Sequence, residues 1–239
     1  FFFKQKTAYE IRNCDWSSDV CSSDLDKNYE NQINLINENL VKMGSILEQQ
    51  FSDALKVVAS RDQNLANKVV EKDDLINQLN HDISDLVFQI IAMRQPMADD
   101  LRFLFCSIKI IRDLERIGDH LTTVAKKGYR VSTNIPDQLI EKLEVLGGKA
   151  SVMTHDALNC LFERKLAQAD QIAERDDIID DLHGNFIKDV LSYMKENDDF
   201  IPDSLALIQI SKGIERIGDY VTNIMEEVHF LIEGKYNNS

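Results

Sequence analysis

Turn-forming residues are scarce in this sequence of 239 residues, which has only 3 Pro and 9 Gly. So few of them leave little material for the many tight turns of a β-sandwich or a β-barrel. Long apolar runs are missing as well, because no stretch approaches the ~18–20 residues of a membrane-spanning helix. The formal charge of −14 disfavours nonspecific nucleic-acid binding, since an acidic surface repels the phosphate backbone.

The residues that are abundant favour helices. Hydrophobic residues make up 44% of the chain and charged residues 28%. This balance is ample for a buried core, so the chain is not expected to be disordered. It is also typical of long amphipathic helices, and we therefore predict an all-α fold.

The segment from Phe1 to Leu25 differs from the rest of the chain. It reads FFFKQKTAYEIRNCDWSSDVCSSDL, which has neither helical periodicity nor the apolar region and cleavage site of a signal peptide. Codons that can encode Lys4–Ile11 and Cys14–Leu25 resemble common library-primer sequence. We therefore interpret residues 1–25 as translated sequencing adapter, a non-native segment, and leave them out of the fold prediction.

Two cysteines lie outside this segment, Cys106 and Cys160, far apart and each in an apolar stretch. That arrangement offers neither a disulfide framework nor a Cys-x-x-Cys metal site. We expect buried, reduced thiols, which fits a cytoplasmic protein.

The rest of the chain contains an internal repeat. EKDDLINQL at Glu71–Leu79 returns as ERDDIIDDL at Glu174–Leu182, and LERIGDHLTTV at Leu114–Val124 returns as IERIGDYVTNI at Ile214–Ile224. Asp53-Ala54-Leu55 likewise returns 103 residues later, at the same offset as the first motif. Matches in the same order at nearly the same spacing indicate duplication.

Each copy divides into three predicted helices. They cover residues 26–60, 62–94 and 97–131 in the first copy and 136–163, 166–196 and 202–233 in the second. Pro96 and Pro202 mark natural breaks, because proline starts helices well and disfavours helix at the preceding residue. Three apolar series follow the helical period: Ile76, Leu79, Ile83, Leu86 and Ile90; Ile110, Leu114, Ile117, Leu121 and Val124; and Ile210, Ile214, Ile217, Val221 and Ile224. Short connections favour antiparallel neighbours, so we predict two tandem three-helix bundles, residues 26–133 and 134–239.

Acidic residues repeat on the third helix of each bundle. Glu115 and Asp119 lie four residues apart and therefore on one helix face, and the second copy repeats them as Glu215 and Asp219. A glycine lies within each pair, although a mid-helix glycine costs roughly 1 kcal/mol relative to alanine. The repeated glycine indicates close approach of another helix.

The second helix of each bundle adds another polar pair, Asp73 with Asn77 and Asp176 with Asp180. If neighbouring helices pack antiparallel, the two pairs of one bundle could face each other. Carboxylates at close quarters repel, so either their pKa values rise or a cation lies between them. Oxygen ligands suit Mg²⁺, Ca²⁺ or Mn²⁺, and bridging carboxylates also suit iron clusters.

Other interpretations stay open at this point. An Arg or Lys lies three residues before each acid of the two Glu-x-x-x-Asp pairs, so the acidic faces can also be ion-pair ladders on a metal-free helical scaffold. His120 could join a metal site, but Tyr220 replaces it in the second copy. The sequence has no Gly-rich phosphate loop, Ser-His-Asp arrangement or nucleophile elbow, and we do not expect an enzyme.

The two Glu-Arg-Ile-Gly-Asp motifs closely resemble the PhoU family of bacterial regulators of phosphate uptake and of the phosphate-starvation response. The resemblance covers essentially Tyr29–Gly234 and includes Met43-Gly44 and Asp100-Leu101-Arg102. It implies a tandem pair of three-helix bundles with multinuclear metal sites of iron or another divalent metal, such as Zn, Mn or Mg. The ligand positions that it implies are Asp73, Asn77, Glu115, Asp119, Asp176, Asp180, Glu215 and Asp219. Asn77 departs from the family's usual carboxylate, so we expect the first site to be the weaker one.

The resemblance further implies a cytoplasmic adaptor that is often a homodimer. Its partners would be the high-affinity phosphate ABC transporter, through the ATPase subunit, and a phosphate-responsive histidine kinase. When phosphate is plentiful, the adaptor would hold the kinase in its inactive or phosphatase mode and restrain phosphate uptake. Neither nucleic acid nor a membrane span is part of this expectation.

Overall fold

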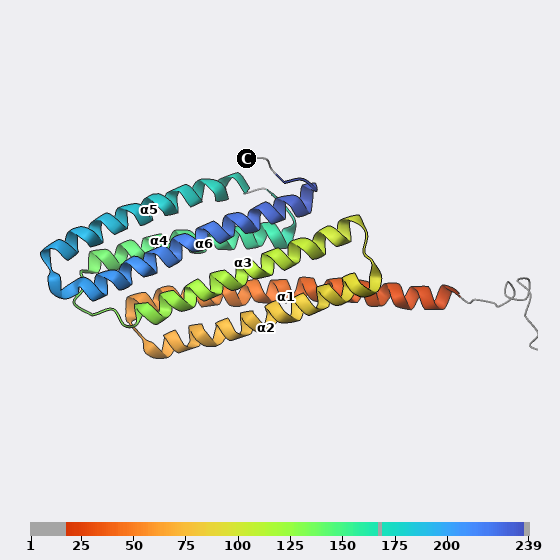
Figure 1. Ribbon diagram of the computed structural model, residues 1–239, viewed down its shortest axis with the longest axis horizontal. Coiled ribbons are helices and arrows are strands. Elements are labelled where there is room, and N and C mark those ends of the chain that lie inside the picture. Colours follow the sequence, from red (N-terminus) through yellow and green to blue (C-terminus); the bar gives the residue numbers. More distant parts are fainter. Residues whose placement is uncertain (1–17, 167–168, 237–239) are drawn as a thin grey trace, which may run out of the picture. The chain divides into compact units, whose positions relative to one another are not determined.

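The structure is a computed structural model that describes residues 18–166 and 169–236. Within these residues the chain forms six α-helices and one short 3-10 helix, and no strand. The elements are α1 (Ser18–Ser60), α2 (Gln63–Arg94), α3 (Ala98–Gly128), α4 (Asp137–Glu163), α5 (Ala169–Glu196), η1 (Asp198–Phe200) and α6 (Ile201–Glu233) (Figure 1). The predicted all-α fold is confirmed.

Packing divides the chain into an N-terminal unit, Phe1–Leu35, and a second unit, Ile36–Ser239. Most of the predicted adapter segment, residues 1–17, lies outside the described residues, and its foreign origin stays a prediction. The first helix begins at Ser18, earlier than the predicted start near residue 26.

The helix ends follow local chemistry. Asp62 caps α2, because its Oδ1 accepts hydrogen bonds from the main-chain N–H groups of Asn64 at 2.8 Å and Leu65 at 3.3 Å. Gln95 ends α2 in a left-handed conformation, with φ 47°, just before Pro96. Pro202 lies in the first turn of α6, where its missing N–H costs no intrahelical hydrogen bond. These breaks agree with the sequence prediction.

Within the second unit the helices pack as two tandem bundles. Gln50 of α1 donates hydrogen bonds to Val69 O of α2 and Thr122 Oγ1 of α3, and α2 packs on α3. In the second repeat α4, α5 and α6 all pack on one another. The predicted tandem three-helix architecture is therefore confirmed. α3 and α6 lie side by side and join the two bundles (Figure 1).

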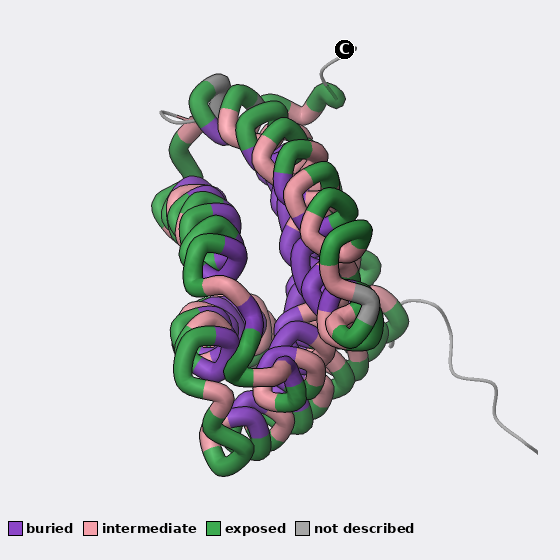
Figure 2. The backbone as a smooth tube through the Cα atoms, turned by 90° about the vertical axis from the view of Figure 1, so that its left-hand side faces the viewer, coloured by how far each residue is buried: buried purple, intermediate pink, exposed green. Residues whose placement is uncertain are grey.

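The predicted apolar series line the bundle interiors. All five members on α3 and all five on α6 are buried. On α2 the predicted series is wrong at one position, because Val87 is buried and Leu86 is only half-buried. Since the helix has 3.6 residues per turn, residues at a fixed spacing gradually move off the buried face. Figure 2 shows the buried positions facing inward between the helices. None of the described helices is long and apolar enough to cross a membrane.

The repeat is visible in paired contacts as well as in the sequence. Lys72 Nζ lies 2.6 Å from Asp53 Oδ2 between α2 and α1, and Arg175 forms the equivalent ion pair with Asp156 between α5 and α4. Both residues of the second ion pair lie 103 residues after the corresponding residues of the first. The duplicated sequence therefore conserves an ion pair that fixes the first two helices of each bundle.

Two glycines allow close contact between α1 and α4. A Cβ atom at Gly44 would lie 2.8 Å from the Phe162 ring, and one at Gly147 would overlap the Leu55 side chain. Gly44 and Gly147 also occupy equivalent repeat positions. A side chain at Gly44 would displace the Phe162 ring, and one at Gly147 would displace the Leu55 side chain.

Cys106 and Cys160, the two cysteines outside the predicted adapter, are buried and form no disulfide with each other, as predicted. Burial is the main cause that raises the pKa of the Cys106 thiol to about 11, with the neighbouring Glu227 carboxylate adding to it. The Cys106 thiol is therefore protonated at neutral pH and inert as a nucleophile.

Candidate functional site

In the first bundle, the mid-helix glycine of α3 lies against polar side chains from two other helices. A Cβ atom at Gly118 would lie 2.9 Å from Asp73 Oδ1 of α2 and 3.3 Å from Gln50 Oε1 of α1. The close approach that the sequence indicated is therefore present. It brings Asp73 next to the helix that carries Glu115 and Asp119.

Gln50 is fully buried, with 0% of its surface exposed, and it fixes this junction. Its Nε2 donates to Asp73 Oδ1, Gly118 O and Thr122 Oγ1, all at 3.3 Å, and to Val69 O at 3.2 Å. Its Oε1 has no hydrogen-bond partner within the described residues. One amide group therefore ties α1 to both α2 and α3.

The acids of the first bundle influence one another. Burial, as the main cause, raises the pKa of Asp73, and Asp119 raises it further, while the Gln50 hydrogen bond opposes both. Burial likewise raises the pKa of Glu115, and the charges of Asp119 and Asp73 add to it. Asp73 on α2 and Glu115 and Asp119 on α3 thus lie close enough for their charges to interact, while their role as metal ligands stays a prediction.

The second bundle has the same glycine contact without the amide. A Cβ atom at Gly218 would lie 2.5 Å from Asp176 Oδ1. That oxygen is buried and has no hydrogen-bond partner in the described part of the chain. Met153, which is fully buried, takes the repeat position of Gln50, and its thioether has no hydrogen to donate.

Four acids interact in the second bundle. Burial is the main cause that raises the pKa of Asp176 to about 6, and the charges of Asp180, Asp219, Asp177 and Glu215 raise it further. Burial also raises the pKa of Asp180, again with contributions from Glu215 and Asp219. The charges of the four predicted ligand positions of this bundle therefore influence one another.

Two further buried oxygens lack partners near these clusters. Asn77 Oδ1 in the first bundle and Glu215 Oε2 in the second have no hydrogen bond among the described residues. Carboxylate and amide oxygens are the ligands of hard divalent cations, so these positions fit a metal chemically. No group of three or more His, Cys, Asp or Glu side chains in the described ranges converges closely enough to hold a metal ion as it stands. The metal ligands stay a prediction.

Ion pairs also follow the helices, but differently in the two bundles. On α6, Lys212 Nζ lies 2.5 Å from Glu215 Oε1 and Arg216 Nη1 lies 3.2 Å from Asp219 Oδ2. On α3, Arg116 pairs with Asp113 at 3.4 Å, and within the described residues no ion pair holds the acids of the α3 motif. The ladder expected from the sequence is therefore complete only in the second bundle.

His120 lies between the two acidic clusters. Its ring stacks on that of Tyr220 with centroids 5.6 Å apart, so the histidine of one repeat contacts the tyrosine at its equivalent position. Burial, as the main cause, lowers the pKa of His120, and the charges of Asp119, Glu215 and Asp219 oppose that effect. A metal role for His120 stays open, but its position is at the α3–α6 contact.

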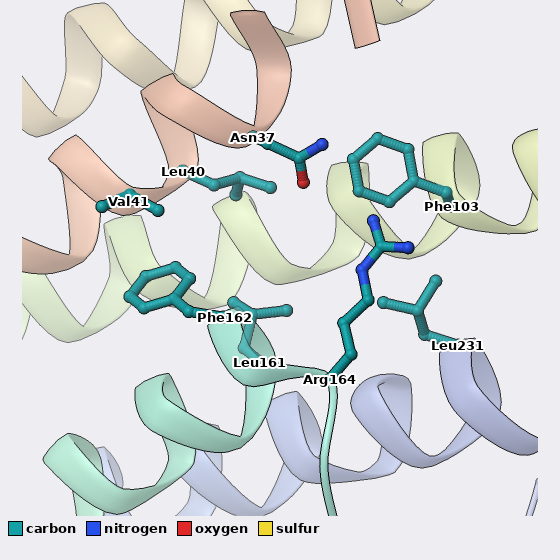
Figure 3. Close-up of a pocket in the computed structure, with 8 residues that line it drawn as sticks. All are labelled: Asn37, Leu40, Val41, Phe103, Leu161, Phe162, Arg164 and Leu231. Atoms are coloured by element: carbon teal, nitrogen blue, oxygen red, sulfur yellow. The ribbon is translucent and has the colours of Figure 1, made fainter. Parts of the chain in front are cut away.

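A separate pocket of about 250 Å³ opens between α1, α3, α4 and α6. The Arg164 guanidinium points into it and lies 5.2 Å from the Phe103 ring centroid (Figure 3). The rest of its wall is mainly apolar, with Leu40, Val41, Leu161, Phe162 and Leu231 beside Asn37. This pocket differs chemically from the acidic clusters, because none of the residues that line it is acidic.

Two of these features were missed by sequence reasoning. Gln50 follows Met43 and Leu47 at helical spacing in an apolar series, which indicates a buried polar side chain with bonding partners. Arg164 has no comparable signal, because its left-handed conformation, with φ 52°, depends on how α4 ends.

Comparison with known proteins fits this geometry. The model of the PhoU domain matches residues 40–128 and again residues 143–228, once for each repeat. The phosphate-specific transport system accessory protein PhoU homolog of Clostridium acetobutylicum is 33% identical over 210 residues, covering 87% of this chain and 96% of that protein. The PhoU protein of Escherichia coli is 32% identical over 218 residues, 90% of each chain.

Solved structures show the same architecture. The crystal structure of PhoU from Pseudomonas aeruginosa superposes with a TM-score of 0.81 at 30% identity, covering 87% of this chain and all of that one. PhoU from Streptococcus pneumoniae, titled a phosphate transport system regulatory protein, gives a TM-score of 0.80 at 27% identity and 88% coverage of this chain. The fold defines a tandem helical-bundle protein. The chain belongs to the PhoU family.

Proposed function

We propose that this protein is a cytoplasmic accessory regulator of phosphate transport. The observation that carries the proposal is that both repeats match the PhoU domain and that relatives aligned over nearly the whole chain are named accessory proteins of the phosphate-specific transport system. When phosphate is plentiful, the protein restrains phosphate uptake and represses the phosphate-starvation two-component response. It performs no catalytic step of its own.

The proposed partners are the ATPase subunit of the phosphate ABC transporter and a phosphate-responsive histidine kinase. Long helices with exposed acidic positions, such as Asp74, Asp82 and Asp85 on α2, supply docking surface for basic partner faces. We also propose that the protein acts as a homodimer. Analytical ultracentrifugation gives its oligomeric state, and co-purification with each partner tests the interactions.

The proposed metal sites use the clustered oxygens of each bundle. Asp73, Asn77, Glu115 and Asp119 would hold a cation in the first bundle, and Asp176, Asp180, Glu215 and Asp219 in the second. A divalent cation such as Fe, Zn, Mn or Mg would neutralise carboxylates that otherwise repel one another. One buried oxygen of Asp176 and one of Glu215, each without a hydrogen-bond partner among the described residues, support this proposal for the second bundle.

Complementation tests the regulatory proposal. We expect this protein, expressed in Escherichia coli that lacks its own PhoU, to restore repression of a phosphate-starvation promoter fused to a reporter in phosphate-rich medium. It should also bring phosphate uptake back toward the level of the intact strain. A chain that is present at normal amount but leaves the reporter fully active would contradict the proposal.

A metal-free scaffold is the second candidate, and the ion pairs of Glu215 with Lys212 and of Asp219 with Arg216 favour it. Mass spectrometry of residues 26–239 separates the two. The variant changes Glu115, Asp119, Glu215 and Asp219 to their amides. Metal in the parent and none in the variant supports the metal sites, whereas a metal-replete parent without metal supports the scaffold. Chelator should lower the melting temperature only of a metal-loaded parent.

A further inference from the structure

One buried position distinguishes the two bundles more sharply than the acidic motifs do. Gln50 and Met153 lie 103 residues apart at equivalent repeat positions, and each has 0% of its surface exposed. The two side chains are similar in length, but only the glutamine carries N–H donors. A bundle core therefore has an amide donor in one repeat and a thioether in the other.

The amide nitrogen of Gln50 lies within a set of oxygens. A carboxylate oxygen of Asp73, the hydroxyl of Thr122 and the carbonyls of Val69 and Gly118 all lie within 3.2–3.3 Å of Nε2. Hard cations select surroundings of this kind, made only of oxygen atoms. In the first bundle the two N–H groups of Gln50 take that central position.

The second bundle has the corresponding oxygens without the donor. Asp176 Oδ1, which packs against Gly218, has no hydrogen-bond partner within the described ranges. Thr222, the counterpart of Thr122, donates to Asp219 O at 2.7 Å instead. A buried carboxylate oxygen without a partner is costly, so Asp176 needs a proton or a cation.

We infer that Gln50 does in the first bundle what a bound divalent cation does in the second, namely to provide a partner for the inner aspartate oxygen that packs against the mid-helix glycine. The inference rests on the proposed metal role of the acidic motifs. It makes Gln50 and Met153 positioning residues that decide which bundle depends on metal. The first bundle then depends less on its proposed cation than the second bundle does.

Introducing the amide into the second bundle tests this inference. The background Glu115→Gln/Asp119→Asn leaves only the second bundle's acids complete. In that background, Met153→Gln supplies the missing donor, and Met153→Leu is the matched control because it keeps the volume without a donor. Mn²⁺ is the probe, followed by calorimetric titration, metal content and melting temperature.

We expect Met153→Gln to melt higher than Met153→Leu in metal-free buffer, because the amide satisfies Asp176. We also expect its Mn²⁺ dissociation constant to be at least tenfold higher than that of Met153→Leu, in the range that outer-shell changes produce. Equal metal-free melting temperatures and equal dissociation constants would overturn the inference.

Failure of the proposed metal role gives a different result. A parent protein that binds no Mn²⁺ refutes the metal role and the statement that a cation acts in the second bundle. The comparison of Met153→Gln with Met153→Leu in metal-free buffer still tests whether an amide at this position stabilises the bundle. Gln50→Met provides the converse measurement in the native background. It should lower the metal-free melting temperature and enlarge the rise that Mn²⁺ produces, and an unchanged rise would contradict the inference.

Discussion

The two bundles share one acidic pattern but satisfy it by different means. In the first, Gln50 donates to Asp73, and the acids of the α3 motif have no ion pair among the described residues. In the second, Asp176 Oδ1 has no hydrogen-bond donor in the described part of the chain, while Glu215 and Asp219 pair with cations of their own helix. Three of the four acidic positions recur in both bundles, with Asn77 at the position of Asp180, but the groups that contact them differ.

The difference shows that repeated surface residues do not guarantee equivalent sites. A single difference in the core, glutamine in one repeat and methionine in the other, decides whether the aspartate of the neighbouring helix has an amide donor. Asp176, which lacks the amide, has a pKa raised to about 6, while the hydrogen bond from Gln50 opposes the rise at Asp73.

Removing the amide should have the largest effect. Gln50→Leu leaves the buried Asp73 carboxylate without its donor, and we expect a loss of about 3 kcal/mol in the free energy of unfolding. Met153→Leu should cost below about 1.5 kcal/mol, because it conserves apolar volume. Urea unfolding of the metal-free proteins gives both values. Equal losses in the free energy of unfolding would show that Gln50 and Met153 contribute equally to stability.

Asp176 should make the metal-free protein less stable as the pH rises. Its folded-state pKa is raised from 3.8 to about 6, first by burial and then by Asp180, Asp219, Asp177 and Glu215. An acid with a raised pKa favours the folded state when protonated, so its contribution is lost as the pH increases from about 4 to 6. Asp176→Asn should therefore gain about 1–2 kcal/mol at pH 7.5, allowing for solvent screening, and little at pH 4.

The measurement is chemical unfolding of both proteins at several pH values in chelator. If the parent and Asp176→Asn show the same pH dependence, Asp176 is not the group responsible. With saturating metal the order at pH 7.5 should reverse under the metal proposal, because the amide is a poorer ligand for a divalent cation.

The two mid-helix glycines should respond unequally to alanine. Alanine favours the helix by about 1 kcal/mol at either position. At Gly118, however, the new methyl group displaces Asp73 and Gln50, which are tied by hydrogen bonds. At Gly218 it displaces only the end of the Asp176 side chain. We expect a net loss of about 1 kcal/mol for Gly118→Ala and almost none for Gly218→Ala, measured by thermal unfolding.

Much of this fold could be predicted from sequence because its determinants are local and periodic. Pro96, Pro202 and Asp62 set helix ends through main-chain chemistry, and the series from Ile110 to Val124 identified the buried face of α3. The prediction that Leu86 is buried was wrong, because the helical period places its neighbour Val87 on the buried face at that turn. The repeat itself predicted that the two halves would have the same architecture.

The candidate site was less predictable because its distinguishing features are long-range. The spacing of Glu115 and Asp119 placed them on one face, and the glycine between them indicated a close neighbour. The identity of that neighbour required Gln50, which is distant in sequence from Gly118 and belongs to another helix. The stacking of His120 on Tyr220 likewise depends on the α3–α6 contact, which no local pattern specifies.

The smallest expected difference concerns the cations beside the motifs. Arg216 pairs with Asp219, whose side chain is 40% exposed, whereas Arg116 pairs with Asp113, whose side chain is 12% exposed. Exposed ion pairs contribute below about 0.5 kcal/mol, so Arg216→Gln should be almost neutral. Arg116→Gln should cost about 0.5–1 kcal/mol, because burial already raises the pKa of Asp113 and the arginine opposes that rise.

Unfolding at low and at high salt measures both variants. If Arg216→Gln costs as much as Arg116→Gln and salt removes the cost, the ladder on α6 contributes to the stability of the second bundle, and Asp219 is then less available to a metal than Asp119.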